Sequence, residues 1–453
     1  MPQKKILLVY LTMTCHDALP EEIGRRYRYT FYKNARLSLE YLAAVIEAKG
    51  DPVDIIDQSV HWFTAYDIIT TIQCGKYLFV GFYVNGVIVE KTAQFIKTIK
   101  EKSTTPLVCG GPGTIQLETL LTAGCDIVCC GEGENTIVDV VAYFKRQKQL
   151  DEIQGIAFMR KGVVITTEQR LLIANLDTIP FPVRNKIPLL AYNDYYLPTL
   201  RKPYAVVITS RGCPYRCTYC FSHCWWCDTY RVRSVENVLQ EIDELHTRHG
   251  VRYIIFRDDV FGYQYKWLEE FCVQLKKRRY LLKWMCNFYP RAYPDKIHEA
   301  IALMGDAGCD FIHIGLPSAN RDILKSIGRG ESEPRLVRTI IPLAKKANMM
   351  VMLEFIFGLP GETEETIKET IHYARSVKPH LVNYNPLGIA PLTALYYNGD
   401  RSSYMPAQVT QKWCRYATRR HYLNLNNGIM IFWLILKKNP IWLINIVRFL
   451  IYW

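Results

Sequence analysis

The sequence lacks the features of secreted and membrane-spanning proteins. Its first residues, 1–5, are polar and lead straight into an apolar strand, so we expect no signal peptide. Two apolar runs, 429–436 and 441–453, both fall short of the roughly 20 residues that a helix needs to cross a bilayer. The fifteen cysteines are odd in number and scattered, which does not fit a disulfide framework. We therefore expect a cytoplasmic protein with reduced thiols in an anoxic compartment.

Acidic residues are also fewer than basic ones, 43 against 56, which gives a formal net charge of +13. Such a charge could suit nucleic acid, anionic lipid or an acidic substrate. We find no appended RNA-binding module, so we interpret the charge as a solvated surface and expect no nucleic-acid partner. A hydrophobic content of 49% with 22% charged residues excludes a disordered chain, and 453 residues suffice for two or three domains.

What the chain does contain is a compact cysteine motif. Cys213, Cys217 and Cys220 have C-x3-C-x2-C spacing, with an aromatic residue on each side of the last cysteine, Tyr219 and Phe221. A cubane iron–sulfur cluster has four irons and is normally closed by four thiolates. Three thiolates would leave one iron open, where a ligand can bind and react.

Two further cysteines, Cys224 and Cys227, leave other interpretations open. Together with Cys217 and Cys220 they could form a closed electron-transfer cluster, because such clusters also use compact cysteine runs. A zinc ribbon fits less well, since its two cysteine pairs usually lie roughly 15–20 residues apart. The sequence favours the open three-cysteine cluster and assigns no role to Cys224 or Cys227.

The first part of the chain alternates short apolar runs with amphipathic stretches. Expected strands lie at 5–10, 53–57, 78–83, 106–109 and 126–130, and expected helices near 36–49, 63–73, 89–102, 114–123 and 134–147. This alternation predicts an α/β fold: a doubly wound, Rossmann-like parallel sheet over residues 1–148. Ligands of such sheets bind beyond the carboxyl ends of the strands. The loops expected there contain Asn85, Gly110, Gly111, Gly131 and Glu132.

Residues 149–200 are predicted to be a linker. Two apolar segments flank the dipeptide 161–162, Lys-Gly, which indicates a hairpin turn. A connection rich in proline and tyrosine follows, and we can assign no chemistry to it.

A second domain is predicted over residues 201–400. Its expected strands lie at 205–208, 252–257, 282–286, 311–315, 350–356 and 381–385, each separated from the next by a helix. Six such βα units predict a partial (β/α)6 barrel. The cysteine motif follows the first strand, at the end where βα barrels place their active sites. A helical, partly apolar extension, 401–453, is expected to follow.

These motifs resemble the radical S-adenosylmethionine (SAM) superfamily, and in particular its cobalamin-binding class. The cysteine spacing matches the superfamily signature, and segment 37–45 with the loops at 110–112 and 131–134 looks like the cobalamin domain. The resemblance implies a [4Fe–4S] cluster on Cys213, Cys217 and Cys220. It also implies that the open iron chelates SAM, and that reduction of the cluster releases a 5'-deoxyadenosyl radical. Cobalamin is the third cofactor implied.

The resemblance also implies particular contacts. Cobalamin is expected at the five loop residues given above. SAM is expected to contact Tyr219, Phe221, Asp258, Ser318, Gly358 and Pro360. For Asp258, the alternative to a SAM contact is a structural role as a helix cap.

Three departures from the family pattern stand out. There is no Asp-x-His-x-x-Gly motif, so no side chain matches the histidine that ligates cobalt in cobalamin mutases. Gly113 stands where many relatives carry histidine. Pro317 stands where relatives usually carry a glutamate that is expected to contact SAM. A domain that kept its fold but lost cobalamin is the competing interpretation.

The function implied by the resemblance is C-methylation of an unactivated carbon in a small-molecule or lipid-like substrate. An electron donor such as flavodoxin or ferredoxin would be its partner. One alternative is a radical oxidative cyclase or rearrangement enzyme, like the anaerobic ring cyclases of tetrapyrrole synthesis. Another is a sensor that binds the cluster and cobalamin without turnover.

The carboxyl-terminal segment allows two interpretations. Trp433, Trp442 and Trp453 lie near basic residues, which is typical of a segment lying in a membrane interface. The alternative is a helical pair that closes the open side of the barrel.

Overall fold

The computed structural model describes residues 4–12, 36–61, 63–86, 88–192, 199–398 and 404–422. The chain forms two compact units, the first over Met1–Tyr195 and the second essentially over Tyr196–Ile451. Each unit has its own sheet and its own core, as expected from the two stretches of βα alternation.

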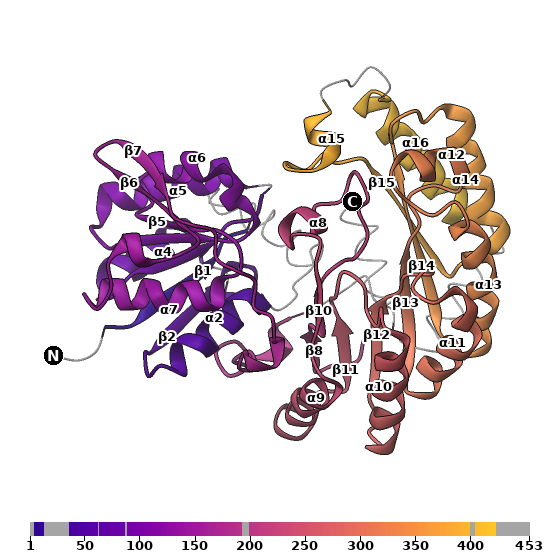
Figure 1. The fold of residues 1–453 in the computed structure, drawn as a ribbon, viewed down its shortest axis with the longest axis horizontal. Helices are drawn as coiled ribbons and strands as arrows, with labels where there is room; N and C mark the ends of the chain where they lie inside the picture. Colours follow the sequence, from indigo (N-terminus) through magenta and orange to yellow (C-terminus); the bar gives the residue numbers. More distant parts are fainter. Residues whose placement is uncertain are drawn as a thin grey trace. The chain divides into compact units, whose positions relative to one another are not determined.

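Unit 1 is built around a sheet that, within the described residues, has seven strands in the order β2-β1-β3-β4-β5-β6-β7 (Figure 1). The first five of these pair in parallel, and β1 lies between β2 and β3. This order confirms the doubly wound, Rossmann-like prediction. The five parallel strands are β1 (Ile6–Tyr10), β2 (Val53–Asp57), β3 (Val80–Tyr83), β4 (Leu107–Gly110) and β5 (Ile127–Cys129).

The helices of unit 1 form two groups. One group pairs α2 (Leu37–Glu47) with α7 (Gly133–Phe144), and the other packs α5 (Val89–Lys102) against α4 (Ala65–Cys74) and α6 (Leu117–Thr122). Because the strands are buried on both faces, they are apolar at nearly every position, and all five residues of β1 are buried. The core is continuous from β1 to β5.

Most of the segment predicted as a linker packs with unit 1. The hairpin predicted around residues 161–162 is present, but its strands β6 (Ile156–Arg160) and β7 (Val163–Thr166) join the sheet of unit 1 in antiparallel pairing. Beyond the hairpin, Arg184 forms a buried ion pair with Glu40 of α2, N–O distance 2.7 Å. Residues 149–192 therefore fold with unit 1. The sequence pattern missed this because β7 is largely exposed and carries no core signal.

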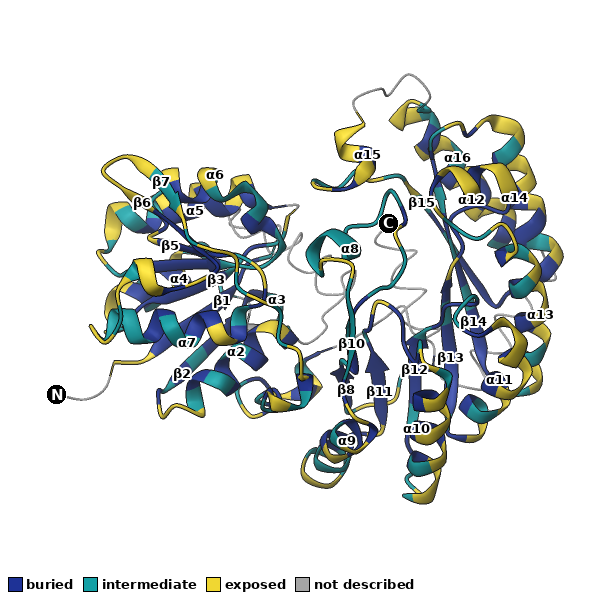
Figure 2. Ribbon diagram, in the orientation of Figure 1, coloured by how far each residue is buried: buried dark blue, intermediate teal, exposed yellow. Residues whose placement is uncertain are grey.

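Unit 2 is a partial barrel of six parallel strands, all within residues 199–398, in the order β15-β14-β13-β12-β11-β8. This confirms the predicted (β/α)6 architecture. Helices cover the outer face of the curved sheet, and most of the strand residues are coloured as buried (Figure 2). The strands are β8 (Tyr204–Val207), β11 (Tyr253–Phe256), β12 (Lys283–Asn287), β13 (Cys309–Gly315), β14 (Met350–Phe357) and β15 (Leu381–Pro386).

The helices of unit 2 begin and end where their sequences indicate. Helix α9 (Val235–His249) starts at Ser234, whose hydroxyl accepts a hydrogen bond from the Asn237 N–H, and stops at Gly250 with φ +63°. The other outer helices are α10 (Tyr265–Lys277), α11 (Ile297–Asp306), α12 (Arg321–Ser326), α13 (Glu333–Lys346) and α14 (Glu364–Val377).

A further helix, α16 (Ala407–Tyr422), covers the last strand of the barrel. The Tyr422 hydroxyl donates to the Val382 carbonyl at 2.8 Å and accepts from the Val382 N–H at 2.9 Å, so it pairs backbone groups that an edge strand would leave open. The apolar runs at 429–436 and 441–453, and the three tryptophans beside them, lie outside the described residues. Among the helices that the structure describes, none is both long and apolar enough to cross a membrane.

Candidate active site

The cysteine motif lies on a loop whose two ends are held together by a short ribbon. Strand β9 (Ser210–Gly212) enters the loop and β10 (Tyr230–Val232) leaves it, and the two pair antiparallel with Gly212 opposite Tyr230. Gly212 has φ +92°, and a Cβ there would lie 2.0 Å from the Thr229 carbonyl oxygen. The loop therefore starts at the carboxyl end of β8 and closes on itself beside the mouth of the barrel.

Asp258, at the end of β11, anchors the segment that leads into this loop. Its Oδ1 accepts hydrogen bonds from the N–H groups and the hydroxyls of both Thr209 and Ser210. Its Oδ2 is buried and has no hydrogen-bond partner in the described structure. Burial raises the pKa of Asp258 to about 6, although those hydrogen bonds act in the opposite direction. The carboxyl group positions the start of the cysteine loop rather than capping the next helix.

The middle of the loop is held by two distant segments of the barrel. The Thr218 N–H donates to the Ile327 carbonyl at 3.1 Å, and the Leu395 N–H donates to the Thr218 carbonyl at 3.1 Å. The Cys224 thiol donates to the Leu392 carbonyl at 3.0 Å. Cys224 thus helps to hold the loop against the segment that follows β15. Cys227 is exposed, with φ +50°.

The three motif thiols lie in a partly water-excluded environment. Burial raises the pKa of Cys213 to about 12 and that of Cys220 to about 11. Burial also raises the pKa of Cys217, while the adjacent Arg329 guanidinium acts in the opposite direction. Before metal binding the thiols are therefore protonated at neutral pH, and binding iron must displace their protons.

Arg329 and Glu333 form a buried ion pair next to Cys217. The guanidinium nitrogens lie 2.5 and 3.0 Å from Glu333 Oε2, and a third contact joins Arg329 to the Gly315 carbonyl at 2.6 Å. The two side chains are 7% and 0% exposed. The position of Arg329 beside the cysteine motif was not predicted from the sequence.

Of the residues predicted to bind SAM, Tyr219, Gly358 and Pro360 lie together with the cysteine loop. Tyr219 packs on a small apolar cluster that includes Leu359, the residue between the other two. Gly358 has φ +90° and donates its N–H to the buried carboxylate of Glu362. Their contacts with SAM stay a prediction.

The other predicted SAM contacts differ from one another in their surroundings. The Phe221 ring lies 5.7 Å from the ring of Trp225 and is half-buried. Ser318 is fully buried: its hydroxyl lies 3.2 Å from the Thr370 hydroxyl and accepts from the Asn320 N–H. In this structure Ser318 therefore stabilises the turn between β13 and α12, and its role toward SAM is untested.

The predicted cobalamin loops meet at one edge of the unit 1 sheet, since β3, β4 and β5 are neighbours. The Val84 N–H donates to the Gly110 carbonyl at 2.7 Å, which joins the first loop to the second. Among the described residues, a Cβ on Gly86 or Gly131 would meet no atom within 4 Å, and one on Gly110 would meet its nearest neighbour at 4.0 Å. This edge is therefore an open surface of backbone, which fits a large flat ligand.

Two residues at this edge are held in place by their neighbours. A Cβ on Gly113 would lie 2.5 Å from Val84 Cγ1, so no side chain at this position could reach a ligand without displacing the loop. Glu132 is buried, and its carboxylate accepts from the Ile173 N–H at 2.7 Å. Glu132 thus fixes the segment after the β6–β7 hairpin. The contacts of Glu132, Asn85 and Gly111 with cobalamin stay a prediction.

A polar chain inside the barrel was missed by sequence reasoning. It runs across neighbouring strands from Asn287 on β12 through His313 on β13 to Glu354 on β14. These residues come from three separate strands, one from each, so they share no spacing signal in the sequence. Only the burial pattern of β14, in which Glu354 is half-exposed between buried neighbours, reveals the inner face.

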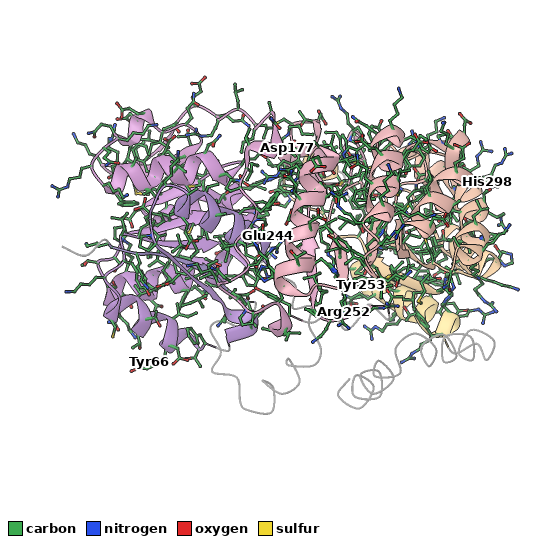
Figure 3. All side chains as sticks on the ribbon, turned by 90° about the horizontal axis from the view of Figure 1, so that it is seen from below. Tyr66, Asp177, Glu244, Arg252, Tyr253 and His298 are labelled. Atoms are coloured by element: carbon green, nitrogen blue, oxygen red, sulfur yellow. The ribbon has the colours of Figure 1, made fainter. Side chains whose placement is uncertain are left out.

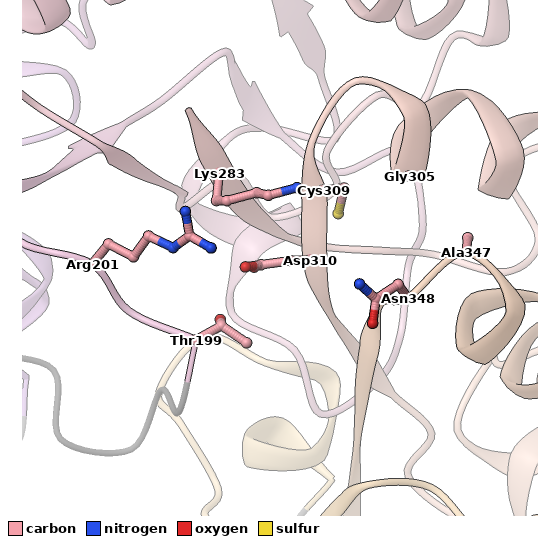
Figure 4. Close-up of a pocket in the computed structure, with 8 residues that line it drawn as sticks. All are labelled: Thr199, Arg201, Lys283, Gly305, Cys309, Asp310, Ala347 and Asn348. Atoms are coloured by element: carbon pink, nitrogen blue, oxygen red, sulfur yellow. The ribbon is translucent and has the colours of Figure 1, made fainter. Parts of the chain in front are cut away.

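The barrel also has a cavity at the opposite, amino-terminal end of its strands. It has a volume of about 360 Å3. Figure 4 shows Arg201, Lys283 and Asp310 among the side chains around it. Asp310 accepts a hydrogen bond from the buried Tyr253 hydroxyl at 2.7 Å. Because active sites of βα barrels lie at the carboxyl ends of the strands, we assign this cavity no catalytic role.

Within the described residues, no three His, Cys, Asp or Glu side chains converge closely enough to hold a single metal ion. In a cubane cluster each thiolate binds a different iron, so cluster ligands stand further apart than the ligands of one ion. The three cysteines of the clamped loop fit such a cluster.

Comparison with known proteins identifies both units. The Radical SAM superfamily profile matches residues 207–374, and the B12 binding domain profile matches residues 32–141. An uncharacterized methyltransferase, PH0819, of Pyrococcus horikoshii is 29% identical over 388 residues, which are 84% of this chain and 81% of the relative. The anaerobic magnesium-protoporphyrin IX monomethyl ester cyclase of Cereibacter sphaeroides is 27% identical over 60% of this chain, and the match spans only 44% of the cyclase.

Two solved structures share the fold. The radical SAM methyltransferase TsrM of Kitasatospora setae, with cobalamin and a [4Fe–4S] cluster bound, has a TM-score of 0.69 at 17% identity and covers 87% of this chain and 74% of its own. The cobalamin-dependent radical enzyme OxsB has a TM-score of 0.68 at 20% identity over 88% of this chain and 55% of its own. The chain is therefore an enzyme of the radical SAM superfamily that carries an amino-terminal B12-binding domain, with a [4Fe–4S] cluster, SAM and cobalamin as its cofactors.

Proposed function

We propose that this enzyme transfers a methyl group to an unactivated carbon of a small-molecule substrate. The observation that carries the proposal is the cysteine loop, clamped at the carboxyl ends of six parallel strands, in a chain that also has a B12-binding unit. Its similarity to an uncharacterized methyltransferase over 84% of the chain supports the same reaction class.

The protein's own residues would hold and shield the reacting groups. Cys213, Cys217 and Cys220 would bind the cluster, with Asp258 and Gly212 fixing the ends of their loop. The open glycine edge of unit 1 would hold cobalamin through its backbone. When bound, these cofactors supply a 5'-deoxyadenosyl radical from SAM and a methyl group from cobalamin. The barrel would orient the substrate and exclude water and oxygen.

The test uses the full chain, reconstituted without oxygen in the presence of iron, sulfide and hydroxocobalamin. It is given dithionite, SAM labelled in the methyl group, and metabolite extract. Labelled methyl groups in an organic product together with 5'-deoxyadenosine support the proposal. An unlabelled new product supports the alternative of a radical cyclase. The chain is also similar to an anaerobic magnesium-protoporphyrin IX monomethyl ester cyclase. An intact cluster that never yields 5'-deoxyadenosine supports a sensor.

Two variants provide matched controls. Cys217→Ala removes a motif thiol and should abolish both the cluster's absorption and 5'-deoxyadenosine formation. Cys224→Ala removes a thiol of the same loop that hydrogen-bonds to a backbone carbonyl, and should retain both. Cluster loss in the Cys224 variant as well as in the Cys217 variant would instead favour the closed four-thiolate arrangement.

A further inference from the structure

The polar chain inside the barrel connects four neighbouring strands, β12 to β15, and the segment that follows β11. Asn287 Nδ2 donates to the Asp258 carbonyl at 2.9 Å, and Asn287 Oδ1 lies 3.1 Å from Nδ1 of His313. His313 Nε2 lies 3.2 Å from Oε2 of Glu354. On the far side, Glu354 Oε1 accepts from Asn385 Nδ2 at 2.6 Å and from Asn383 Nδ2 at 3.3 Å. This row of polar side chains therefore begins at Asp258, the residue that anchors the cysteine loop.

These polar side chains face the inside of the barrel. Along β14 the residues alternate: Leu353 and Phe355 are buried toward the helices, and Glu354 between them is partly exposed. The side chains of His313 and Glu354 are 23% and 32% exposed. In Figure 1, β13, β14 and β15 lie side by side in the middle and right of unit 2. The polar groups can thus be reached from the barrel interior.

There is open space beside the carboxylate. Gly315 is the register partner of Glu354 on the neighbouring strand β13. It is exposed, and a Cβ on it would meet no atom of the described residues within 4 Å. A ligand group can therefore approach Glu354 over Gly315.

Carboxylate and amide oxygens border this space, while the Arg329 guanidinium, which donates to the Gly315 carbonyl, is neutralised by its ion pair with Glu333. Burial acts to raise the pKa of Glu354, but the His313 imidazole and the two amides outweigh it, so the pKa is lowered and the group is a carboxylate. Asn383 and Asn385 each use their Nδ2 on Glu354, and no described residue donates to their Oδ1 atoms. Carboxylate and amide oxygens together accept several hydrogen bonds.

His313 completes the surroundings of the carboxylate. Since Asn287 uses its amide N–H on Asp258, its Oδ1 is the acceptor and His313 Nδ1 is the donor. His313 Nε2 lies 3.2 Å from Oε2 of Glu354 but is not aligned for a hydrogen bond within the described structure. Glu354 Oε2 can therefore still accept a hydrogen bond from a ligand group.

We propose that Glu354, with His313, Asn383 and Asn385, binds a primary amine of the substrate. An ammonium group has three donors and no acceptor, which matches a carboxylate surrounded by acceptor atoms. This inference rests on the proposed function, because it names the class of molecule that the methyltransferase takes: a small amine rather than a purely apolar lipid or ring. An alcohol, with one donor, would bind more weakly.

The test measures binding without turnover. Saturation-transfer NMR compares n-butylamine, n-butanol and butyrate, which share a carbon chain and differ in the head group. The full chain carries its cluster and cobalamin, with SAM present and no reductant. We expect butylamine to bind most tightly. Glu354→Gln should weaken butylamine binding about tenfold or more and leave butanol nearly unchanged, since a hydrogen bond to a charged group is lost.

Three controls make the result decisive. Glu244→Gln removes an exposed carboxylate of α9 and should change nothing (Figure 3). Thermal unfolding shows whether Glu354→Gln still folds; if it does not, Asn385→Leu decides, because it removes an acceptor and keeps the charge. Equilibrium dialysis of SAM against Glu354→Gln shows whether the carboxylate serves SAM instead.

Equal binding of butylamine and butanol, or butylamine binding that is unchanged in Glu354→Gln, would overturn the proposal. So would competition between SAM and butylamine combined with weaker SAM binding in the variant. Failure of methyl transfer with the amine preference intact would contradict the proposed function and leave the amine site standing.

Discussion

Gly212 and Thr229 face each other across the base of the cysteine loop so closely that a Cβ on Gly212 would lie 2.0 Å from the Thr229 carbonyl oxygen. The clash is with backbone, which cannot move aside as a flexible side chain can. The two residues lie at the paired ends of the loop, next to Cys213 and Tyr230. This close contact holds together the two ends of the loop that carries the three thiols.

We therefore expect Gly212→Ala to lose most of its cluster. The added methyl group must open the β9–β10 ribbon, because the backbone there also has φ +92°. Iron and sulfide content per chain after anaerobic reconstitution is the measurement. Gly250→Ala is the matched control: its φ is +63° but a Cβ meets no atom within 4 Å, so we expect a cost of about 1 kcal/mol and a normal cluster. Full iron content in Gly212→Ala would contradict this.

Removal of the Arg329 guanidinium should destabilise unit 2. Arg329→Met leaves the Glu333 carboxylate, which is 0% exposed, without its nearest cation, and we expect a loss of about 3 kcal/mol in the free energy of unfolding. Arg329→Met combined with Glu333→Leu should recover part of this loss. Arg321→Met breaks an exposed pair of the same type, 3.1 Å from Glu331, and should cost less than about 1 kcal/mol. Equal losses for both single variants would refute the prediction.

The carboxyl group of Glu362 should give the protein a measurable pH dependence. Burial raises its pKa to about 7 from an ordinary value of 4.5, against the effect of hydrogen bonds from Gly358 and Leu359. Between these pH values the folded chain holds a proton that the unfolded chain has lost, so the free energy of unfolding falls as the pH rises. The contribution is at most about 3 kcal/mol.

Glu362→Gln should remove this contribution, so its unfolding free energy should fall less between pH 4.5 and 7. The buried Asp258, whose pKa is also raised, contributes to both proteins and cancels in the comparison. Glu364→Gln, at an exposed position of the same loop–helix junction, should keep the wild-type slope. Denaturant unfolding at a series of pH values measures all three, and parallel curves for Glu362→Gln and wild type would rule the effect out.

The sequence predicted what is encoded by repetition or by close spacing. The apolar runs predicted the parallel strands that the structure describes in both sheets, and the cysteine spacing marked the loop that the structure places after β8. Features that depend on distant contacts could not be predicted. The sequence indicates only that Glu132 lies in a loop, and the hydrogen bond that it accepts from the Ile173 N–H is visible only in the structure. The contacts of Arg329 with Glu333 and Cys217 are likewise visible only in the structure.

A final prediction concerns the open edge of unit 1. Gly86 follows β3, is exposed, and has no atom within 4 Å of where its Cβ would be, whereas Gly113 in the next loop is packed against Val84. If cobalamin lies on this edge, a large side chain at position 86 occupies its place without disturbing the fold. A methyl group at position 113 instead displaces Val84.

We therefore expect Gly86→Trp to keep the thermal unfolding midpoint and to lose cobalamin, and Gly113→Ala to lower the midpoint, since its Cβ would lie 2.5 Å from Val84 Cγ1. The absorption spectrum of protein purified with hydroxocobalamin, after gel filtration, reports retention of the cofactor. Because the cluster lies in the other unit, its iron content should be normal in Gly86→Trp, which separates a local block from general damage. Cobalamin retained at the wild-type ratio in a folded Gly86→Trp would mean that the cofactor does not use the loop after β3.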